Sequence, residues 1–256
     1  MQTKFVRLEG EFAQAGVYRV EPGESLRQLI LRVGGVTPSA YMYGAQLTRE
    51  STRVLQQAKI DEIASRMERD IERAASTKAA SVTSPEAAAG LKAGIENQRE
   101  LVKKLKSTKA TGRVVLEMDP EQNGIKALPD VALEDGDRIF IPAPPGTINV
   151  LGSVYNESAF LFKPEKRLSD YLNQAGGPTR DADESSIYVI KADGSVISKR
   201  QSGWLSTGFN GDRMMPGDTI VVPEDFDRFS WTKELKEWAQ IMYQLALGAA
   251  AFKTLR

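Results

Sequence analysis

The chain contains no cysteine and no histidine among its 256 residues. Disulfide bonds, thiolate nucleophiles and imidazole bases are therefore excluded, and a metal ion would have to bind through carboxylates. The 34 basic residues balance the 34 acidic ones, so the bulk charge gives no reason to expect a nucleic-acid partner. The lack of cysteine is compatible with either the cytosol or the periplasm.

Two sequence signals are also missing. The first ten residues, MQTKFVRLEG, contain no apolar core of a signal peptide, and residues 5–8 already have the pattern of a strand. We therefore expect Met1 to begin a truncated chain. No GxGxxG or GxxxxGK[ST] motif is present to cradle phosphates, so we interpret the Gly-Gly pairs at 34–35 and 176–177 as helix stops. We expect no cofactor and no bound metal.

An internal repeat organises the sequence. The segment that begins at Phe5 matches the segment that begins at Thr147, with a constant offset of 142 residues. The matched pairs include Gly10 with Gly152, Pro22 with Pro164, Leu26 with Leu168, Thr37 with Thr179, and Arg49 with Lys191.

The ends of the two copies also match, but at a smaller offset. Gly136-Asp137 corresponds to Gly217-Asp218, which is an offset of 81 residues. The difference of 61 residues between the offsets 142 and 81 predicts an insertion in the first copy, between about residues 50 and 111. At the same place the second copy needs a tight turn at residues 192–194.

Each copy has the pattern of a small mixed domain. Alternating apolar residues, as at 16–20, predict half-buried strands, and residues 25–31 have helical periodicity. Gly34 is placed to end that helix. The order strand, turn, strand, helix, Gly-Gly and further strands predicts an α+β fold in which a small sheet curls around one helix.

The insertion predicts a helical hairpin. Ser84 and Pro85 can begin its second helix as N-cap and first helical residue. Its charges are interleaved, and we expect the hairpin to pack on a neighbouring subunit or on its own domain. The apolar residues at helical spacing are Ile60, Ile63, Met67, Ile71 and Ala74 on the first helix, and Leu91, Ile95, Val102 and Leu105 on the second.

The terminal segment from Trp231 predicts an amphipathic helix of membrane length. No charged residue lies between Glu237 and Lys253, and a helix over residues 231–255 would be about 37 Å long. A bilayer core is about 30 Å thick. Apolar residues recur on one face, Trp231 and Trp238 lie near one end, and Lys253 and Arg256 lie at the other, as in membrane anchors.

The opposite face of this segment is polar, which suits the wall of a pore. Gln240 and Gln244 need water or partners, and a ring of about eight such helices would supply both around a lumen of about 15 Å. We expect the channel to be lined by Lys233, Glu237, Gln240 and Gln244. The residues expected to face lipid are Trp231, Leu235, Trp238, Met242, Leu245 and Phe252.

Other interpretations of single motifs are weaker. The acidic pairs Asp181/Asp183 and Glu134/Asp135 lie in turns, and such pairs arise by chance in a chain with 34 acids, so a glycosidase role is not favoured. Trp204 could stack on a sugar ring together with Phe209, although a place at a rim or in a contact between subunits is favoured.

The repeated signature resembles a known family. It comprises Gly10, Gly16-Val17-Tyr18, Leu26, Gly34-Gly35 and Gly136-Asp137-Arg138-Ile139 in the first copy, and Gly152, Leu168, Gly176-Gly177-Pro178-Thr179 and Gly217-Asp218-Thr219-Ile220 in the second. Together with the terminal helix, it resembles the C-terminal portion of outer-membrane polysaccharide export proteins, with two soluble-ligand-binding β-grasp (SLBB) domains.

The resemblance implies a homo-oligomeric ring that carries capsular or exopolysaccharide from the periplasm to the cell surface. The β-grasp domains would lie in the periplasm, the terminal helices would form an α-helical barrel through the outer membrane, and an inner-membrane polysaccharide co-polymerase would be a partner. The second copy has Asn156-Glu157-Ser158-Ala159 where the first has Gln14-Ala15-Gly16-Val17, so no ligand site is transferred.

We therefore expect a first β-grasp domain over residues 1–145 with its insertion at about 51–110, a second over 146–226, and a membrane helix over 227–256. The expected function is passive, without catalysis. One alternative is a soluble periplasmic module that binds sugar or peptidoglycan and packs its terminal helix on its own domain. An enzyme acting on polysaccharide is a third class, for which no catalytic pair can be placed.

Overall fold

The computed structural model describes residues 3–79, 84–122, 124–199 and 208–225. These residues divide into two compact units. One contains both copies of the repeat, up to Arg49 and again from Arg113 onward, and the other is the insertion over residues 50–112. The membrane helix expected at 227–256 lies outside the described residues.

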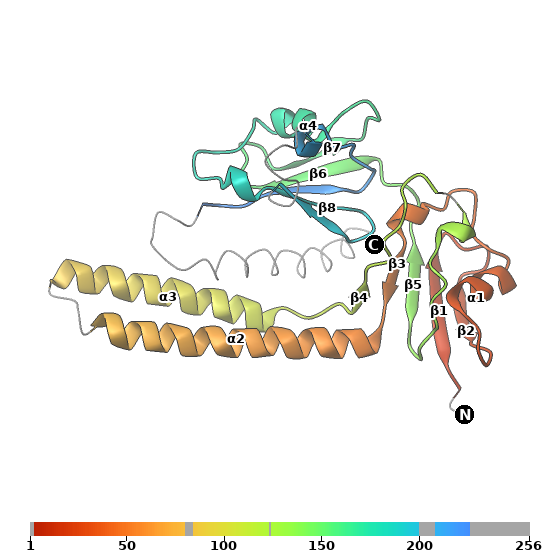
Figure 1. Cartoon of the computed structure of the whole chain (residues 1–256), viewed down its shortest axis with the longest axis horizontal. Coiled ribbons are helices and arrows are strands. Elements are labelled where there is room, and N and C mark those ends of the chain that lie inside the picture. Colours follow the sequence, from red (N-terminus) through yellow and green to blue (C-terminus); the bar gives the residue numbers. More distant parts are fainter. Residues whose placement is uncertain (1–2, 80–83, 123, 200–207, 226–256) are drawn as a thin grey trace. The chain divides into compact units, whose positions relative to one another are not determined.

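The first copy of the repeat forms one five-stranded sheet within the described residues (Figure 1). The sheet has the order β2-β1-β5-β3-β4, with β1 and β5 parallel and the other neighbours antiparallel. Its elements are β1 (Phe5–Gly10), β2 (Gly16–Arg19), α1 (Leu26–Arg32), η1 (Met42–Gly44), β3 (Gln46–Thr48), β4 (Arg113–Val114), η2 (Ile125–Ala127) and β5 (Arg138–Ile141).

The second copy repeats this topology strand for strand. Its sheet has the order β7-β6-β10-β8-β9, again with a parallel central pair, β6 and β10. The expected α+β fold with two matching sheets is therefore confirmed. The elements are β6 (Thr147–Gly152), β7 (Ser158–Leu161), α4 (Leu168–Gln174), η3 (Glu184–Ser186), β8 (Tyr188–Ile190), β9 (Val196–Ser198), α5 (Gly208–Gly211) and β10 (Thr219–Val222).

Alternation along the strands places one face of each sheet against its helix. In the first domain Val6 and Leu8 of β1 point inward and pack with Leu26 and Ile30 of α1, all four at most 1% exposed. Ser25 caps α1 in a capping box with Gln28, in which each side chain accepts from the other residue's backbone N–H. The second domain has the matching core of Ile148, Val150, Leu168, Tyr171, Ile220 and Val222.

The insertion is a hairpin of two long helices, α2 (Glu50–Ala79) and α3 (Pro85–Ser107). Its base is closed by two glutamine side chains of α2, because Gln57 accepts from the Ala110 N–H and Gln56 from the Gly112 N–H, each at 3.0 Å. Packing of this hairpin on a neighbouring subunit remains a prediction. The buried seam between the helices consists of Ile60, Ala64, Ile71, Val102, Leu105 and Ala110.

Within residues 3–79, 84–122, 124–199 and 208–225, no helix combines the length and the apolar character that crossing a bilayer requires. The long helix α2 carries charged residues along its length.

Each domain has one glycine that the parallel strand pair requires. Gly10 ends β1 with φ of 85°, and a Cβ added there would lie 2.1 Å from the Ile141 carbonyl oxygen. Gly152 ends β6 with φ of 94°, and its Cβ would lie 2.1 Å from the Val222 carbonyl oxygen. Both backbones are therefore restricted to glycine by conformation and by close approach.

Replacement of either glycine by alanine should destabilise its domain by about 3 kcal/mol or more, through left-handed backbone strain and backbone overlap together. Gly23→Ala is the matched control, because Gly23 has φ of 80° but no heavy atom within 4 Å of the added Cβ. That control should cost about 1 kcal/mol. Chemical denaturation measures all three, and equal losses at Gly10 and Gly23 would contradict the close approach.

Candidate functional site

The residues expected to line a pore or face lipid lie outside the described residues. This holds for Lys233, Glu237, Gln240 and Gln244, and for Trp231, Leu235, Trp238, Met242, Leu245 and Phe252. Their roles stay predictions. The candidate sites among the described residues belong to the two β-grasp-like domains.

Phe209 cannot stack on a sugar from its place in the structure. It lies in α5, is 3% exposed, and packs in the core of the second domain with residues such as Leu172 and Met214. The interpretation of Phe209 as a surface aromatic is therefore wrong, because α5 turns it inward. Trp204, its expected partner, lies outside the described residues.

Three of the four acidic residues noted as pairs in the sequence have local structural contacts. The Asp183 carboxylate caps η3 by accepting from the Ser185 N–H at 3.1 Å and from two serine hydroxyls. Asp135 accepts from the Phe5 N–H at 2.7 Å, and Glu134 forms an ion pair with Arg49 at 3.0 Å. Each of these three carboxylates already has a role in turns or sheet edges.

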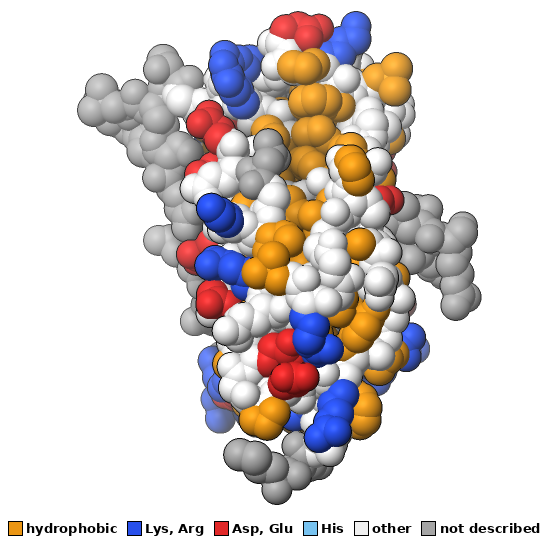
Figure 2. Space-filling view, turned by 90° about the vertical axis from the view of Figure 1, so that its right-hand side faces the viewer, with side chains coloured by type: hydrophobic (Ala, Val, Ile, Leu, Met, Phe, Trp, Pro, Cys, Tyr) orange, Lys and Arg blue, Asp and Glu red, His pale blue; other side chains and the backbone are white. Residues whose placement is uncertain are grey.

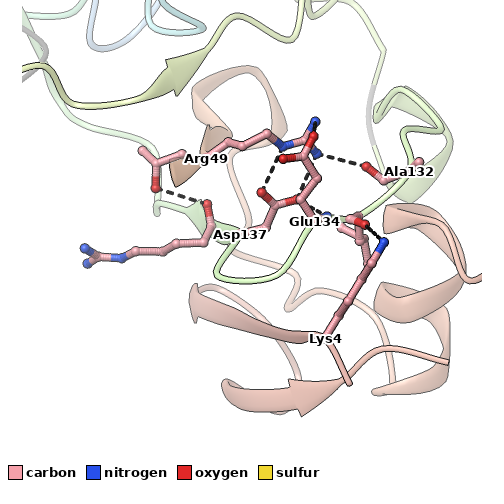
Figure 3. Close-up of polar contacts among 8 residues, drawn as sticks. Lys4, Arg49, Ala132, Glu134 and Asp137 are labelled. Carbon is pink, nitrogen blue, oxygen red and sulfur yellow. Dashed lines mark hydrogen bonds and ion pairs between the residues drawn. The ribbon is translucent and has the colours of Figure 1, made fainter. Parts of the chain in front are cut away.

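A buried aspartate holds the end of the first sheet together (Figure 3). Asp137, which is 0% exposed, precedes β5 and faces Arg49, the residue before α2. The two carboxylate oxygens accept from Arg49 Nε at 2.9 Å and from one of its terminal nitrogens at 2.8 Å. The Glu134 N–H also donates to Asp137, at 2.9 Å, and Arg49 donates to the Ala132 carbonyl. The carboxylate is therefore paired and hydrogen-bonded, as a buried charge requires.

The second domain repeats this device with lysine in place of arginine. Asp218, also 0% exposed, accepts from Lys191 Nζ at 3.1 Å, from the Ala192 N–H and from the Met215 N–H, each of the latter at 2.9 Å. Burial raises the pKa of the Asp218 carboxyl, and Lys191 and the two N–H groups offset this in part. The two aspartates and their basic partners occupy equivalent positions of the repeat.

In the sequence these two clusters appear only as aligned residues of the two copies. The Gly-Asp dipeptides at 136–137 and 217–218 mark the turns, and Arg49 aligns with Lys191, but nothing in the spacing says that the basic side chain reaches the aspartate. Sequence reasoning therefore missed the contact. The signal that could have found it is a basic residue and an acid, each retained in both copies at different offsets.

The two sheets differ on the faces that point away from their cores. Strand register places Arg7, Glu9, Arg19 and Arg138 on this outer face of the first sheet. At the matching positions of the second sheet the register places Asn149, Leu151, Leu161 and Thr219, which carry no charge.

The outer face of the second sheet is also partly covered. Tyr188 and Val221 are neighbours on it, and they are 1% and 0% exposed although they alternate with the core residues Val189 and Ile220. Leu161, on the edge strand β7, is 74% exposed. The outer face of the second sheet is thus uncharged and partly buried, although Asn149 and Thr219 make it polar in part.

The described surface has no dominant charge of one sign on the face drawn in Figure 2. There the basic and acidic side chains form small mixed groups, and hydrophobic side chains form longer stretches. No group of three or more acidic residues suited to hold a metal ion is found in the described parts of the chain.

Comparison with protein-family models identifies both copies of the repeat. The model of the SLBB domain matches residues 5–56 and again residues 147–199. A search of curated proteins gave no match. The two matched segments start at equivalent strands, β1 and β6, so sequence and topology define the same repeat. Each copy of the repeat is therefore matched by the SLBB domain model.

Loss of the Asp137 carboxylate should strongly destabilise the first domain. Asp137→Ala removes the bidentate partner of the partly buried Arg49, which keeps only Glu134 and the Ala132 carbonyl, and we expect the free energy of unfolding to fall by about 3 kcal/mol. Arg49→Lys should cost about 1 kcal/mol, because the second domain uses lysine at this position. Glu9→Ala, which removes an exposed pair with Arg138, is the control and should cost less than about 1 kcal/mol. If Asp137→Ala lowers the free energy of unfolding no more than Glu9→Ala does, the proposed role of Asp137 is wrong.

The buried Asp218 predicts an unusual pH dependence. Because its pKa is raised in the folded state, its contribution to stability is present below the ordinary Asp pKa of about 3.9 and is lost as pH rises through the folded value. The stability of the wild type relative to Asp218→Asn should therefore fall as pH rises over that window.

Glu24 gives the matched control of opposite sign. A hydrogen bond from Arg32 holds the pKa of the Glu24 carboxyl below its ordinary value, so its contribution is present above about pH 4.3 and is lost as pH falls through the folded value. Urea titrations of wild type, Asp218→Asn and Glu24→Gln across pH 3 to 7 would measure how the stability contributions of Asp218 and Glu24 depend on pH. A wild-type advantage over Asp218→Asn that grows with pH would contradict the burial effect.

Proposed function

We propose that the chain is part of a ring-forming subunit that exports capsular or exopolysaccharide across the outer membrane. The observation that supports it is the order of parts: two SLBB domains, followed after β10 by a segment whose sequence has one apolar face and one polar face at bilayer length. In this proposal the SLBB domains lie in the periplasm, and the terminal segment is one helix in the wall of a helical barrel.

The proposed role is passive. The chain lacks cysteine and histidine, and Asp137, Asp183 and Asp218 are engaged in structural hydrogen bonds. We therefore propose a conduit and scaffold without catalysis. Its partners would be further copies of itself, the outer membrane, the exported polymer and an inner-membrane polysaccharide co-polymerase, and no nucleic acid.

The second candidate is a soluble periplasmic module that binds sugar or peptidoglycan and packs its terminal helix on its own domain. It is favoured by one observation, the uncharged outer face of the second sheet, on which Tyr188 and Val221 are buried. An uncharged and partly buried sheet face of this kind is a suitable partner for an amphipathic helix.

Truncation after Ser230 separates the two candidates. We expect the full chain to float with lipid vesicles, and the truncated chain to stay in solution with both SLBB domains folded, as circular dichroism and thermal unfolding would report. If the truncated chain floats equally well, the barrel proposal is wrong. If the full chain does not float and the truncation destabilises the second domain, the module with a docked helix is supported instead.

Two neighbouring residues test which face of the segment is wet. Gln244→Lys places a charge on the face proposed to line the channel, and we expect it to keep membrane association. Leu245→Lys places the same charge on the face proposed to meet lipid, where it should cost about 3 kcal/mol and weaken flotation. Equal flotation of the two variants would contradict the assigned faces.

A further inference from the structure

The turn between β8 and β9 lies at the place where the two copies of the repeat diverge. In the first domain the chain leaves the sheet after β3 for the helical hairpin and returns as β4. In the second domain residues 192–194 turn directly from β8 into β9. The Ala192 N–H donates to the buried Asp218, so the base of this turn is fixed within its own domain.

The tip of that turn contacts the strand by which the first domain's chain returns from the hairpin. A terminal nitrogen of Arg113, in β4, donates to the Ala192 carbonyl at 2.8 Å. A Cβ added at Gly194 would lie 2.7 Å from the Arg113 guanidinium carbon, so the guanidinium lies directly against the glycine. Burial lowers the pKa of Arg113, and the charge of Asp193 opposes this effect.

Asp193 of the second domain accepts a hydrogen bond from the first domain. It is 3% exposed, and one carboxylate oxygen accepts from the Ser195 N–H and hydroxyl at 2.8 and 2.7 Å within the turn. The other oxygen accepts from the Met118 N–H of the first domain at 3.2 Å. A buried carboxylate thus has hydrogen bonds in both domains, and separation of the domains would expose one side of it.

Apolar and neutral contacts surround these charged ones. Ala192 and Met215 of the second domain pack against the core cluster of the first. The Tyr41 hydroxyl donates to the Pro216 carbonyl at 3.0 Å. The contact therefore combines an apolar patch, a neutral hydrogen bond and two buried charged groups, and separation of the domains would remove partners from both charged groups.

We propose that the 192–194 turn is a latch that holds the two SLBB domains as one rigid body, with Arg113 and Asp193 as its positioning residues. The inference goes beyond the export function and does not depend on it. Arg113 is the first residue of β4, and Asp193 lies in the turn between β8 and β9, so both residues belong to the compact unit that holds the two copies of the repeat.

Spin-label distances measure this rigidity directly, and the absence of cysteine makes the chain suited to them. Glu21→Cys and Lys163→Cys place one label on each domain at equivalent, exposed positions of the repeat. The labelled full chain should give one narrow distance distribution. Arg113→Ala and Asp193→Ala should each broaden it, and Arg138→Ala, which removes an exposed arginine from the same sheet, should leave it narrow.

Gly194→Ala disrupts the same contact from the second domain, because its Cβ would overlap the Arg113 guanidinium. Gly194→Ala should also broaden the distance distribution. It therefore tests the latch even if Arg113→Ala or Asp193→Ala unfolds its domain. Hydrogen exchange gives an independent readout, since Asp193→Ala in the second domain should speed exchange of the Met118 amide in the first by about tenfold or more. Narrow distributions in all three variants, or an unchanged Met118 amide, would overturn the latch.

Discussion

Each domain depends on one buried aspartate that closes the sheet at the end of its third strand in chain order. Asp137 and Asp218 accept hydrogen bonds from the basic residue that follows β3 or β8 and from the turn before β5 or β10. A buried carboxylate is tolerated only when such partners are present, so the two segments must meet at the aspartate. After β3 or β8 the chain can then run outside the sheet while the aspartate keeps the neighbouring strands paired. In the first domain residues 50–112 form a helical hairpin at this point, and in the second domain the chain makes a tight turn.

The two domains share one fold and differ in what they present at its surface. The parallel pairs β1/β5 and β6/β10 form the centre of both sheets, and each requires a glycine at the same strand end. Two differences between the copies lie at places that these constraints leave free, namely the exit after the basic residue and the outer face of the sheet. The first domain presents charged residues on that face and carries the hairpin, whereas the second has an uncharged face and a turn that docks on its neighbour.

Much of this architecture could be predicted from the sequence. The paired glycines, the two offsets and the helix stops at Gly34 and Gly176 predicted two α+β domains, and apolar residues such as Ile60 and Val102 predicted the hairpin seam that the structure contains. Contacts between distant side chains could not be predicted. The reach of Arg49 to Asp137, the docking of Gly194 against Arg113 and the burial of Phe209 depend on how turns orient side chains in space, which a single sequence does not encode as a periodic pattern. The pore-lining and lipid-facing residues stay predictions.

The central functional claim is that this chain builds a ring whose terminal segments form a pore. Electron microscopy of the full chain purified in a mild detergent tests it most directly, because it reports assembly and symmetry without needing the polymer or a partner protein. The account predicts closed rings with a central channel and two stacked layers of SLBB domains. Single copies without rings, at concentrations where the protein remains folded, would contradict it.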